Sequence, residues 1–494
     1  MGQFIQKTSF SDTDFQAFQN KLHHCLEALE QVLERPGFGQ GEPSIGAELE
    51  LYLLDSDGRP VPENLAVKEA YDDPTLTLEL NRYNLELNFP PLAGAGSPFT
   101  ALQQQILDNL AGLNQKMAPW QGQVLPIGIL PTLRERDFGP QVMTDLPRYR
   151  VLAEAVQQRR NSTGICIEGQ DNMHLVHDDV TLEGACTSFQ IHYRPRGQDL
   201  VNLWNATQLI TPLMVGVAAN SPLLLGHRLW HETRVPLFCQ SIDGLHSHAD
   251  HPLPPPRVSF GQGWLRHSPI ELFRETVQLY PPLIPILSDE DPLAVVARGG
   301  VPNLDELRLH DGTIWSWNRP VYDPGADPHL RIEMRVLPAG PSAADMAANA
   351  ALFIGLAQGL AEDVEPLLSA LPFSYACRNF YRAAQHGLGA SIYWPNAHQN
   401  SLEEQPLVAV LEQLLPVAEK GLVQVGVNEE EMQFWLSIIS DRLQSGQTGA
   451  SWQLHQYNCL VGNGHSVHEA CQQLLKAYCH HSNGNVPVAR WPNL

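Results

Sequence analysis

Segments in which polar and apolar residues alternate are the feature that most constrains how this chain folds. The clearest of them is Ser44–Leu54. Glu48, Glu50 and Tyr52 share one face of the strand that it predicts, and apolar residues share the other face. Taken alone, the two glutamates also fit a solvated strand face. In a buried site, however, two carboxylates on one face repel each other and need a cation.

Three further segments follow the same pattern. Leu76–Pro91 holds Glu79 and Glu86 among apolar residues. Since they are seven residues apart, the chain must bend or bulge near Asn81–Asn84 if both are to face the same way. In the segment 188–194, Gln190, His192 and Arg194 share one face of the predicted strand. In the segment 330–337, Arg331, Glu333 and Arg335 share one face.

The polar groups on these four segments are of a consistent kind. Carboxylates with one imidazole are typical ligands of Mg²⁺ or Mn²⁺, and arginines suit phosphoryl oxygens. Together they favour phosphoryl transfer from a nucleotide, in which metal ions bridge the phosphates.

Helical spacing recurs between the strand-like segments without a regular strand–helix alternation. It is clearest in 12–33, 100–117, 149–159, 200–218, 268–280, 342–362, 406–421, 429–443 and 468–480. No internal repeat or low-complexity linker divides the chain. We therefore predict an α+β protein with a mostly antiparallel sheet, formed as a single catalytic domain over 1–494. Its core would span about 44–460, with an N-terminal helix at 12–34 and a C-terminal helical region at 461–494.

The composition and the absent motifs exclude several classes of protein. With 31 basic against 54 acidic residues, the formal net charge is −23, so nucleic acid is not an expected partner. The sequence lacks a Walker phosphate loop, a dinucleotide-binding glycine motif, a G-x-S-x-G elbow and an HExxH pair. The chemistry must therefore come from the strand residues above.

The cysteines and the apolar stretches indicate the compartment. Eight cysteines are scattered without a CxxC pair, which is typical of reduced thiols in the cytoplasm. The N-terminus shows no export or lipid signal, and the longest apolar stretch, Leu209–Gly226, is interrupted by Pro212 and Pro222. We expect a cytoplasmic protein that binds small molecules and no membrane. The oligomeric state stays open.

Two groups of histidines lie outside the alternating segments. One is His246–His251, and the other runs from His465 to His481 with Cys471 and Cys479. Neither has the paired spacing of a structural zinc site. We interpret them as a polar loop and a helix face, and the sequence does not decide whether either binds a metal ion.

Six motifs follow one another along the chain. They are Gly46–Glu50, Leu85–Pro91, Gln190–His192, Trp315–Pro320, Arg331–Arg335 and Gly446–Gln453. Together they resemble the glutamate–cysteine ligase type 2 family, carboxylate–amine ligases related to glutamine synthetase, from about Gly46 to Leu460. The resemblance implies a glutamine synthetase-like catalytic fold, in which a curved, mostly antiparallel sheet with flanking helices holds metals and ATP on its concave face.

The resemblance also implies roles for individual residues. The metal ion (Mg²⁺ or Mn²⁺) nearest the transferred phosphate would be held by Glu48, His192 and Glu333, and a second metal group by Glu50, Glu79 and Glu86. Catalysis would depend on Glu48, Glu50, Glu333 and Arg335. The nucleotide would be bound by Gln190, Arg331 and Arg335, and the substrates by Asn88, Trp315, Arg319 and Arg442. Gly446–Gln453 would help to complete the pocket.

The implied reaction has two steps. ATP phosphorylates the side-chain carboxylate of glutamate, and an amine then attacks the acyl phosphate to give a γ-glutamyl amide. Cysteine is the expected amine, which implies a place in glutathione biosynthesis. The alternatives are a ligase of the same fold that uses another amine or amino acid, and a binding relative without catalysis. The intact acidic set argues against the last, because a non-catalytic protein has no need of mutually repelling ligands.

Overall fold

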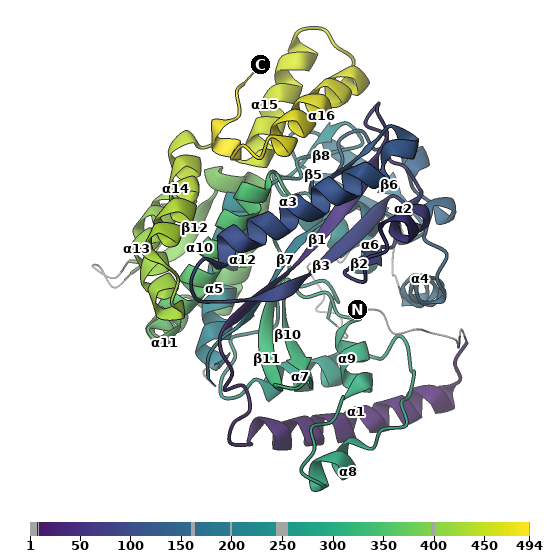
Figure 1. Cartoon of the computed structure of the whole chain (residues 1–494), viewed down its shortest axis with the longest axis vertical. Coiled ribbons are helices and arrows are strands. Elements are labelled where there is room, and N and C mark those ends of the chain that lie inside the picture. The colour runs from purple at the N-terminus through teal and green to yellow at the C-terminus, as the bar shows by residue number, and fades with distance from the viewer. Residues whose placement is uncertain are drawn as a thin grey trace.

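A curled antiparallel sheet runs through the middle of the molecule (Figure 1). The computed structural model describes residues 7, 9–159, 164–197, 200–243, 255–396 and 401–493. The seven strands of the sheet lie in the order β10-β11-β7-β1-β3-β2, with β4 paired to β1. They are β1 (Ser44–Leu54), β2 (Leu76–Leu78), β3 (Asn84–Ala93), β4 (Gln123–Leu125), β7 (Phe189–Arg194), β10 (Asn318–Asp323) and β11 (His329–Met334).

Helices and three short hairpins surround this sheet. The helices are α1 (Asp12–Leu33), α2 (Asn64–Tyr71), α3 (Pro98–Lys116), α4 (Pro147–Arg159), α5 (Leu200–Ala218), α6 (Arg234–Asp243), α7 (Ile270–Leu279), α8 (Pro292–Ala297), α9 (Asp305–Asp311), α10 (Ala343–Ala361), α11 (Val364–Ala370), α12 (Phe373–His386), α13 (Leu407–Val425), α14 (Glu429–Ser445), α15 (Gly449–Gly462) and α16 (Val467–Asn483). The hairpins pair β5 (Gly164–Glu168) with β6 (Asn172–Val176), β8 (Leu223–Leu224) with β9 (His227–Arg228), and β12 (Ser391–Asn396) with β13 (Ser401–Pro406). The predicted fold class, an α+β protein with a curved, mostly antiparallel sheet and flanking helices, is confirmed.

The register of the sheet gathers the predicted polar residues. The residues that face each other on neighbouring strands are Glu48 with Gln190, Glu50 with Glu86, and Glu333 with His192. Because side chains alternate along a strand, a slip of one residue in any of these pairings would turn the polar set away from its partners.

The chain bends between Glu79 and Glu86, as the sequence analysis expected if both glutamates face the same way. β2 ends at Leu78 and β3 begins at Asn84, so a turn separates the two glutamates. Glu86 then lies opposite Thr77 of β2, and Glu79 follows the end of that strand.

The other face of the sheet closes the hydrophobic core. Ile45, Ala47, Leu49, Leu51 and Leu53 of β1 are at most 2% exposed. α3 packs on β3, and α10 packs on β7, α3, α5 and α13. Each buried leucine or isoleucine contributes about 1.5–3 kcal/mol. This burial holds the strands in register and so holds the polar residues of the opposite face in place.

Close approach of α10 and α13 depends on glycine. A Cβ atom at Gly421 of α13 would lie 1.9 Å from the carbonyl oxygen of Gly355 in α10. Within the described residues, α10 is also the one helix long and apolar enough to cross a membrane. Because 94% of that stretch is buried inside the protein, it has the surroundings of a core helix.

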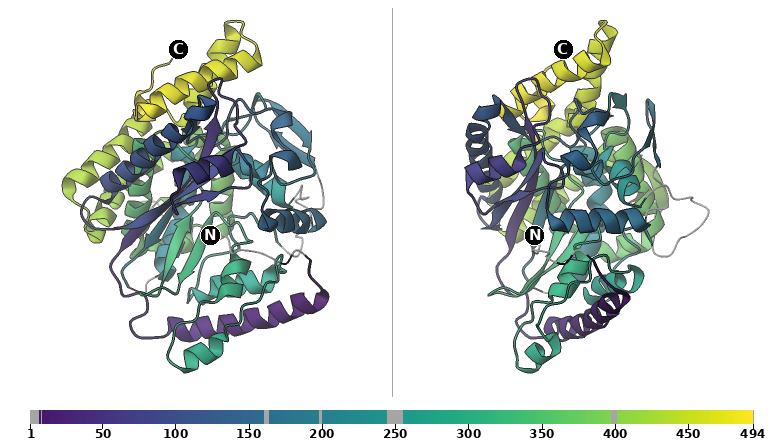
Figure 2. Two further views of the ribbon diagram at one scale, coloured as in Figure 1. Left: turned by 45° about the vertical axis from the view of Figure 1, so that its right-hand side comes forward. Right: turned by 90° about the vertical axis from the view of Figure 1, so that its right-hand side faces the viewer.

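The ends of the molecule are helical. The views in Figure 2 agree with Figure 1 that α15 and α16 lie at one end and α1 with α8 at the other. α1 packs against α7, α8 and α9. It begins at a capping box, in which Ser11 and Asp14 bond each other's backbone N–H groups.

Helices with long apolar repeats were predicted within a few residues of their observed ends. They are α1, α3, α4, α5, α7, α10, α13, α14 and α16. The helical spacing of apolar residues did not predict α2, α6, α8, α9, α11, α12 and α15. Most of these are too short to show a period. α12 and α15 bury the polar residues Asn379 and Gln453, which interrupt the apolar pattern.

Arg442, predicted to bind substrate, lies in the core and lines neither cavity of the polar face. It is 1% exposed on α14. Its Nη2 lies 2.8 Å from Asp345 Oδ1, and its Nη1 donates to Asn349 Oδ1 at 2.7 Å, both on α10. The neighbouring segment Gly446–Gln453 forms the start of α15, where Gln453 is fully buried against Asn220. These groups join helices and do not reach the polar face of the sheet.

Breaking the buried Arg442–Asp345 pair should destabilise the protein strongly. The variant Arg442→Met leaves Asp345 charged and buried, which costs about 3–5 kcal/mol of the free energy of unfolding. Arg490→Met, which breaks the exposed pair with Asp441, is the control and should cost no more than about 1 kcal/mol. Urea unfolding measures both, and equal midpoints for Arg442→Met and the wild type would contradict this account.

Candidate active site

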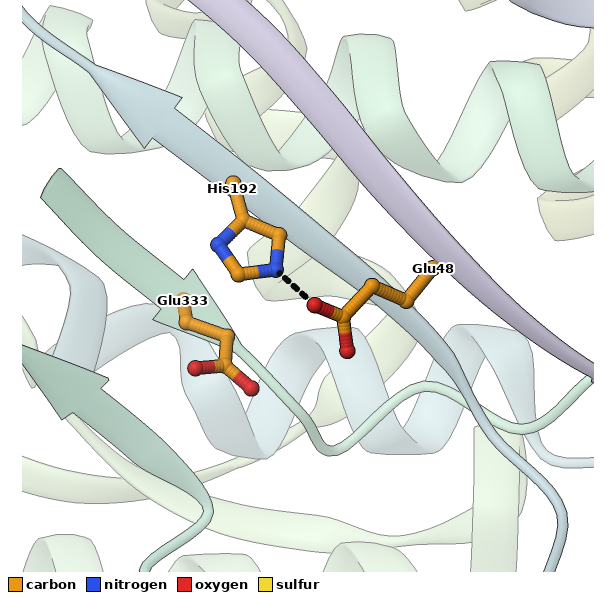
Figure 3. A group of neighbouring side chains, drawn as sticks. All are labelled: Glu48, His192 and Glu333. Atoms are coloured by element: carbon orange, nitrogen blue, oxygen red, sulfur yellow. Dashed lines mark hydrogen bonds and ion pairs between the residues drawn. The ribbon is translucent and has the colours of Figure 1, made fainter. Parts of the chain in front are cut away.

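Two glutamates and a histidine meet on the polar face of the sheet (Figure 3). One ligand atom from each of Glu48, His192 and Glu333 lies within 4.8 Å of the other two. His192 Nε2 is 3.0 Å from Glu48 Oε1, and Arg331 Nε donates to His192 Nδ1 at 3.1 Å. The ring of His192 thus lies between Glu48 and Arg331, with one nitrogen facing each. β1, β7 and β11 thus bring three of the predicted metal ligands together.

Two arginines hold Glu333 in its charged form. Arg319 donates from Nε and Nη2 to the two carboxylate oxygens at 2.8 and 3.0 Å, and Arg335 also bonds this carboxylate. Burial raises the pKa of the Glu333 carboxyl, but the two guanidinium charges outweigh burial and lower it to about 2. Burial likewise opposes the charge of Glu48, whose pKa is nevertheless held well below its usual value by the charge and hydrogen bond of His192.

The second predicted group lies further along β1 and β3. Glu50 accepts hydrogen bonds from Ser188 N at 2.7 Å and Gln190 Nε2 at 3.1 Å, and Glu86 accepts one from Thr77 Oγ1 at 3.0 Å. Burial, and next the charge of Glu79, raises the pKa of Glu50 to about 7. Burial and the charges of Glu48 and Glu79 raise the pKa of Glu86 well above its usual value. This part of the site has more negative charge than the protein itself balances.

Two cavities open on this face. One, of about 210 Å³, is lined by Glu50, Glu79 and Glu86 together with Trp315 and Arg335. The other, of about 490 Å³, is lined by His192, Glu333 and Arg331. Glu48 and Arg319 line both cavities, so the histidine-containing group lies where the two meet. This arrangement offers one compartment on each side of a candidate cation site.

The other predicted binding residues fall into three situations. Gln190 Oε1 accepts a hydrogen bond from Arg335 Nη1 at 2.5 Å inside the smaller cavity, and Trp315 lines the same cavity. Asn88 lies opposite Glu48 on β3 and donates to Thr77 Oγ1 at 3.2 Å, but it lines neither cavity. As described above, Arg442 lies apart from both.

Several residues of the cleft have no signature in the sequence. The short 3₁₀ helix η4 (Glu183–Ala185) contributes Glu183, α4 contributes Arg148 and Tyr149, and α6 contributes Arg234 and Phe238. Burial and the charges of Glu79 and Glu50 raise the pKa of Glu183 to about 8. These residues come from two helices and a 3₁₀ turn, outside the alternating strands, so the alternation did not mark them.

The donor set fits the predicted metal ions. Carboxylate oxygens with one imidazole nitrogen suit Mg²⁺ or Mn²⁺ better than soft metals, and arginines beside them suit phosphate. Among the described residues, the group of Glu48, His192 and Glu333 is the one that brings three ligand atoms within 4.8 Å of one another. The cluster from His465 to His481 forms no such group in the described chain, and His246–His251 lies outside the described residues.

Comparison with known proteins gives first the class and then the family. The profile described as "Glutamate-cysteine ligase family 2 (GCS2)" matches residues 44–477. The chain is therefore a ligase of the class that forms amide bonds. It belongs to glutamate–cysteine ligase family 2. The search of curated proteins found no match.

Three solved structures are similar over most of the chain. Glutamate–cysteine ligase from Francisella tularensis, in complex with AMP, has a TM-score of 0.48 at 10% identity, covering 91% of this chain and 90% of that one. A bifunctional glutathione synthetase from Pasteurella multocida has a TM-score of 0.45 at 13% identity, covering 95% and 55%. The ligase PafA, in complex with the prokaryotic ubiquitin-like protein Pup, has a TM-score of 0.39 at 11% identity, covering 88% and 72%.

The raised pKa of Glu50 gives a pH dependence of stability without metal ions. Its pKa of about 7 in the fold lies above the usual 4.5, so between these values the folded chain binds a proton that the unfolded chain releases. This contribution is present below pH 4.5 and is lost as the pH rises through about 7. In a chelator, the melting temperature should fall less for Glu50→Gln than for the wild type between about pH 5 and about pH 8. Identical slopes in differential scanning fluorimetry would contradict the assignment.

Proposed function

We propose that this protein is an ATP-dependent ligase that joins the side-chain carboxylate of glutamate to the amine of cysteine. One observation carries the proposal: a carboxylate–imidazole group suited to a hard divalent cation lies at the junction of two cavities, beside arginines suited to phosphate and carboxylate. Membership of glutamate–cysteine ligase family 2 supports it. The whole chain then acts as one catalytic domain in the cytoplasm, in glutathione biosynthesis.

The two cavities suit different substrates. The larger one, next to Arg331 and His192, would take ATP, and the smaller one, next to Trp315, would take the amino acids. The γ-phosphate would then lie near Glu48 and Glu333, at the junction. Transfer of this phosphate to glutamate gives γ-glutamyl phosphate and ADP, and attack by the amine nitrogen on the acyl carbon releases phosphate.

The chain's own residues orient the reacting groups. Arg335 bonds both Gln190 and Glu333, which fixes its guanidinium for contact with a phosphoryl oxygen. Arg319 lines both cavities and would hold a substrate carboxylate while it neutralises Glu333. Glu48, His192 and Glu333 would hold one divalent ion, with Glu50, Glu79 and Glu86 for a second, and bound Mg²⁺ or Mn²⁺ neutralises the charge of the phosphates.

No protein nucleophile is needed, because the acyl phosphate is itself the activated intermediate. Positioning and charge stabilisation then account for the catalysis. We therefore expect substitutions that remove a charge from the polar face of the sheet to lower the rate of the ligase reaction.

A substrate panel tests the proposed reaction. ADP release should require Mg²⁺, ATP and glutamate together, and it should increase when cysteine is added. Mass spectrometry should identify the product as a γ-glutamyl amide. A signal with another amine but none with cysteine would contradict the proposal that cysteine is the acceptor. If no amine gives a glutamate-dependent signal, the proposed ligase activity is wrong.

Loss of one cation ligand should stop the reaction without unfolding the protein. Glu48→Gln removes the charge of a carboxylate at the junction of the cavities, and we expect at least about a 10³-fold loss of kcat in glutamate-dependent ADP release. Glu412→Gln, on an exposed position of α13, is the control with unchanged kinetics. Circular dichroism should show equal helix content in both variants. Full activity of Glu48→Gln would exclude its role as a ligand.

A further inference from the structure

Glu183 differs from the other carboxylates of the smaller cavity. Glu48, Glu50, Glu79 and Glu86 each accept a hydrogen bond from a neighbouring group. Within the described part of the chain, neither a hydrogen bond nor an ion pair reaches the carboxylate of Glu183, although it lines the same cavity. An unpaired carboxylate in such a cavity is costly unless a ligand supplies the missing positive charge.

Two of the arginines that line the same cavity as Glu183 are engaged with other partners. Arg335 bonds Gln190 and Glu333. Arg234, whose side chain is 3% exposed, lies 3.3 Å from Glu232 and donates to the carbonyl oxygen of Val336 at 3.1 Å. Both of these guanidinium groups line the cavity, together with Arg148 and Arg319, and neither of the two is paired to Glu183.

Aromatic side chains line the same cavity as Glu183. η4, which carries Glu183, packs on α6, and Cys186 Sγ lies 3.9 Å from the carbonyl oxygen of Arg234. Phe238 lies one helical turn beyond Arg234 and lines the cavity. Its ring centroid is 6.3 Å from that of Trp315, at an interplanar angle of 59°. Phe238 and Trp315 are both partly exposed, so their rings remain accessible from the cavity.

We propose that Glu183, with Phe238 and Trp315, binds the ammonium group of the amine substrate. A carboxylate next to aromatic faces is the combination that attracts an organic ammonium, through a charge-assisted hydrogen bond and cation–π contacts. The inference rests on the proposed ligase function and deepens it, because it assigns the part of the cavity that recognises the second substrate.

The position of Glu183 suits the direction of attack. Glu183 lines the smaller cavity and not the larger one, in which ATP is proposed to bind. An amine held there approaches the acyl carbon from the side opposite the nucleotide. The ammonium gives one proton to the Glu183 carboxylate, the freed lone pair forms the C–N bond, and the bond between the acyl carbon and the phosphate oxygen breaks. Phosphate leaves with that electron pair, and the second nitrogen proton lost passes to water.

The test compares two nucleophiles in the variant Glu183→Gln. Hydroxylamine is largely uncharged at neutral pH and traps an acyl phosphate as a hydroxamate, whereas an amino acid carries an ammonium group. Loss of a charge-assisted hydrogen bond should raise the KM for the amine substrate about 10- to 100-fold. Hydroxamate formation and the KM values for ATP and glutamate should stay within about twofold of the wild type.

Glu135→Gln is the matched control. Glu135 is also a glutamate of a short 3₁₀ helix, η2 (Glu135–Asp137), but it is exposed and lines neither cavity of the site. Its kinetics should equal those of the wild type. Because the change from carboxylate to amide preserves shape, both variants should fold, and thermal melting checks this. As a second probe, Trp315→Leu should raise the KM for the amine in the same direction.

Three other outcomes of this test would contradict the inference. If Glu183→Gln raises the Mg²⁺ concentration needed for half activity and leaves the KM for the amine unchanged, Glu183 is a metal ligand and the inference is wrong. Equal losses with hydroxylamine and with the amine would also overturn it, because the variant would then impair the acyl-phosphate step. If the wild type shows no glutamate-dependent turnover with any amine, the proposed function and this inference both fail.

Discussion

Mutual repulsion of carboxylates on one face of the central sheet is the constraint on which the rest of the site depends. Glu48, Glu50 and Glu86 lie on adjacent strands, and a buried pair of like charges is strongly unfavourable. Two parts of the site differ in how far positive charge compensates this repulsion. Around Glu333, Arg319 and Arg335 supply positive charge, and the pKa falls to about 2. Around Glu50, charge is not balanced, and burial with the charge of Glu79 raises the pKa to about 7. The site is thus divided into a balanced part and a part that favours added cations.

The apolar half of the fold makes this arrangement possible. Alternation places a leucine or isoleucine behind most of the polar residues, and α3 and α10 cover that side. The register of β1 with β3 and β7 then sets which polar groups meet, since a shift by one residue would exchange the two faces. The buried ion pair of Arg442 and Asp345 joins α14 to α10. Packing energy on one face therefore holds together charges that would otherwise separate.

The two cavities have different surroundings, and this difference supports a division of labour between substrates. The larger cavity is lined by His192, Arg331 and Glu333. The smaller cavity is lined by Trp315, by Phe238 and by the unpaired carboxylate of Glu183. In a ligase, phosphate transfer and attack by an amine need these opposite environments: the first stabilises negative charge, and the second binds an ammonium group that becomes the nucleophilic amine when it loses a proton. Glutamate–cysteine ligase family 2, to which the chain belongs, is consistent with that requirement.

The sequence by itself determined four of the strand-forming segments, which contain β1, β2, β3, β7 and β11, and the kinds of group that they present. A period of two residues in Ser44–Leu54 is enough to predict β1 and the shared face of Glu48 and Glu50, because strand geometry is local. The tertiary structure alone decided which strands are neighbours, and so brought His192 and Glu333 to Glu48. It also decided that Arg442 is a core residue and that Glu183 and Phe238 enter the cleft. Those positions depend on packing between segments far apart in the chain, and no local periodicity records such contacts.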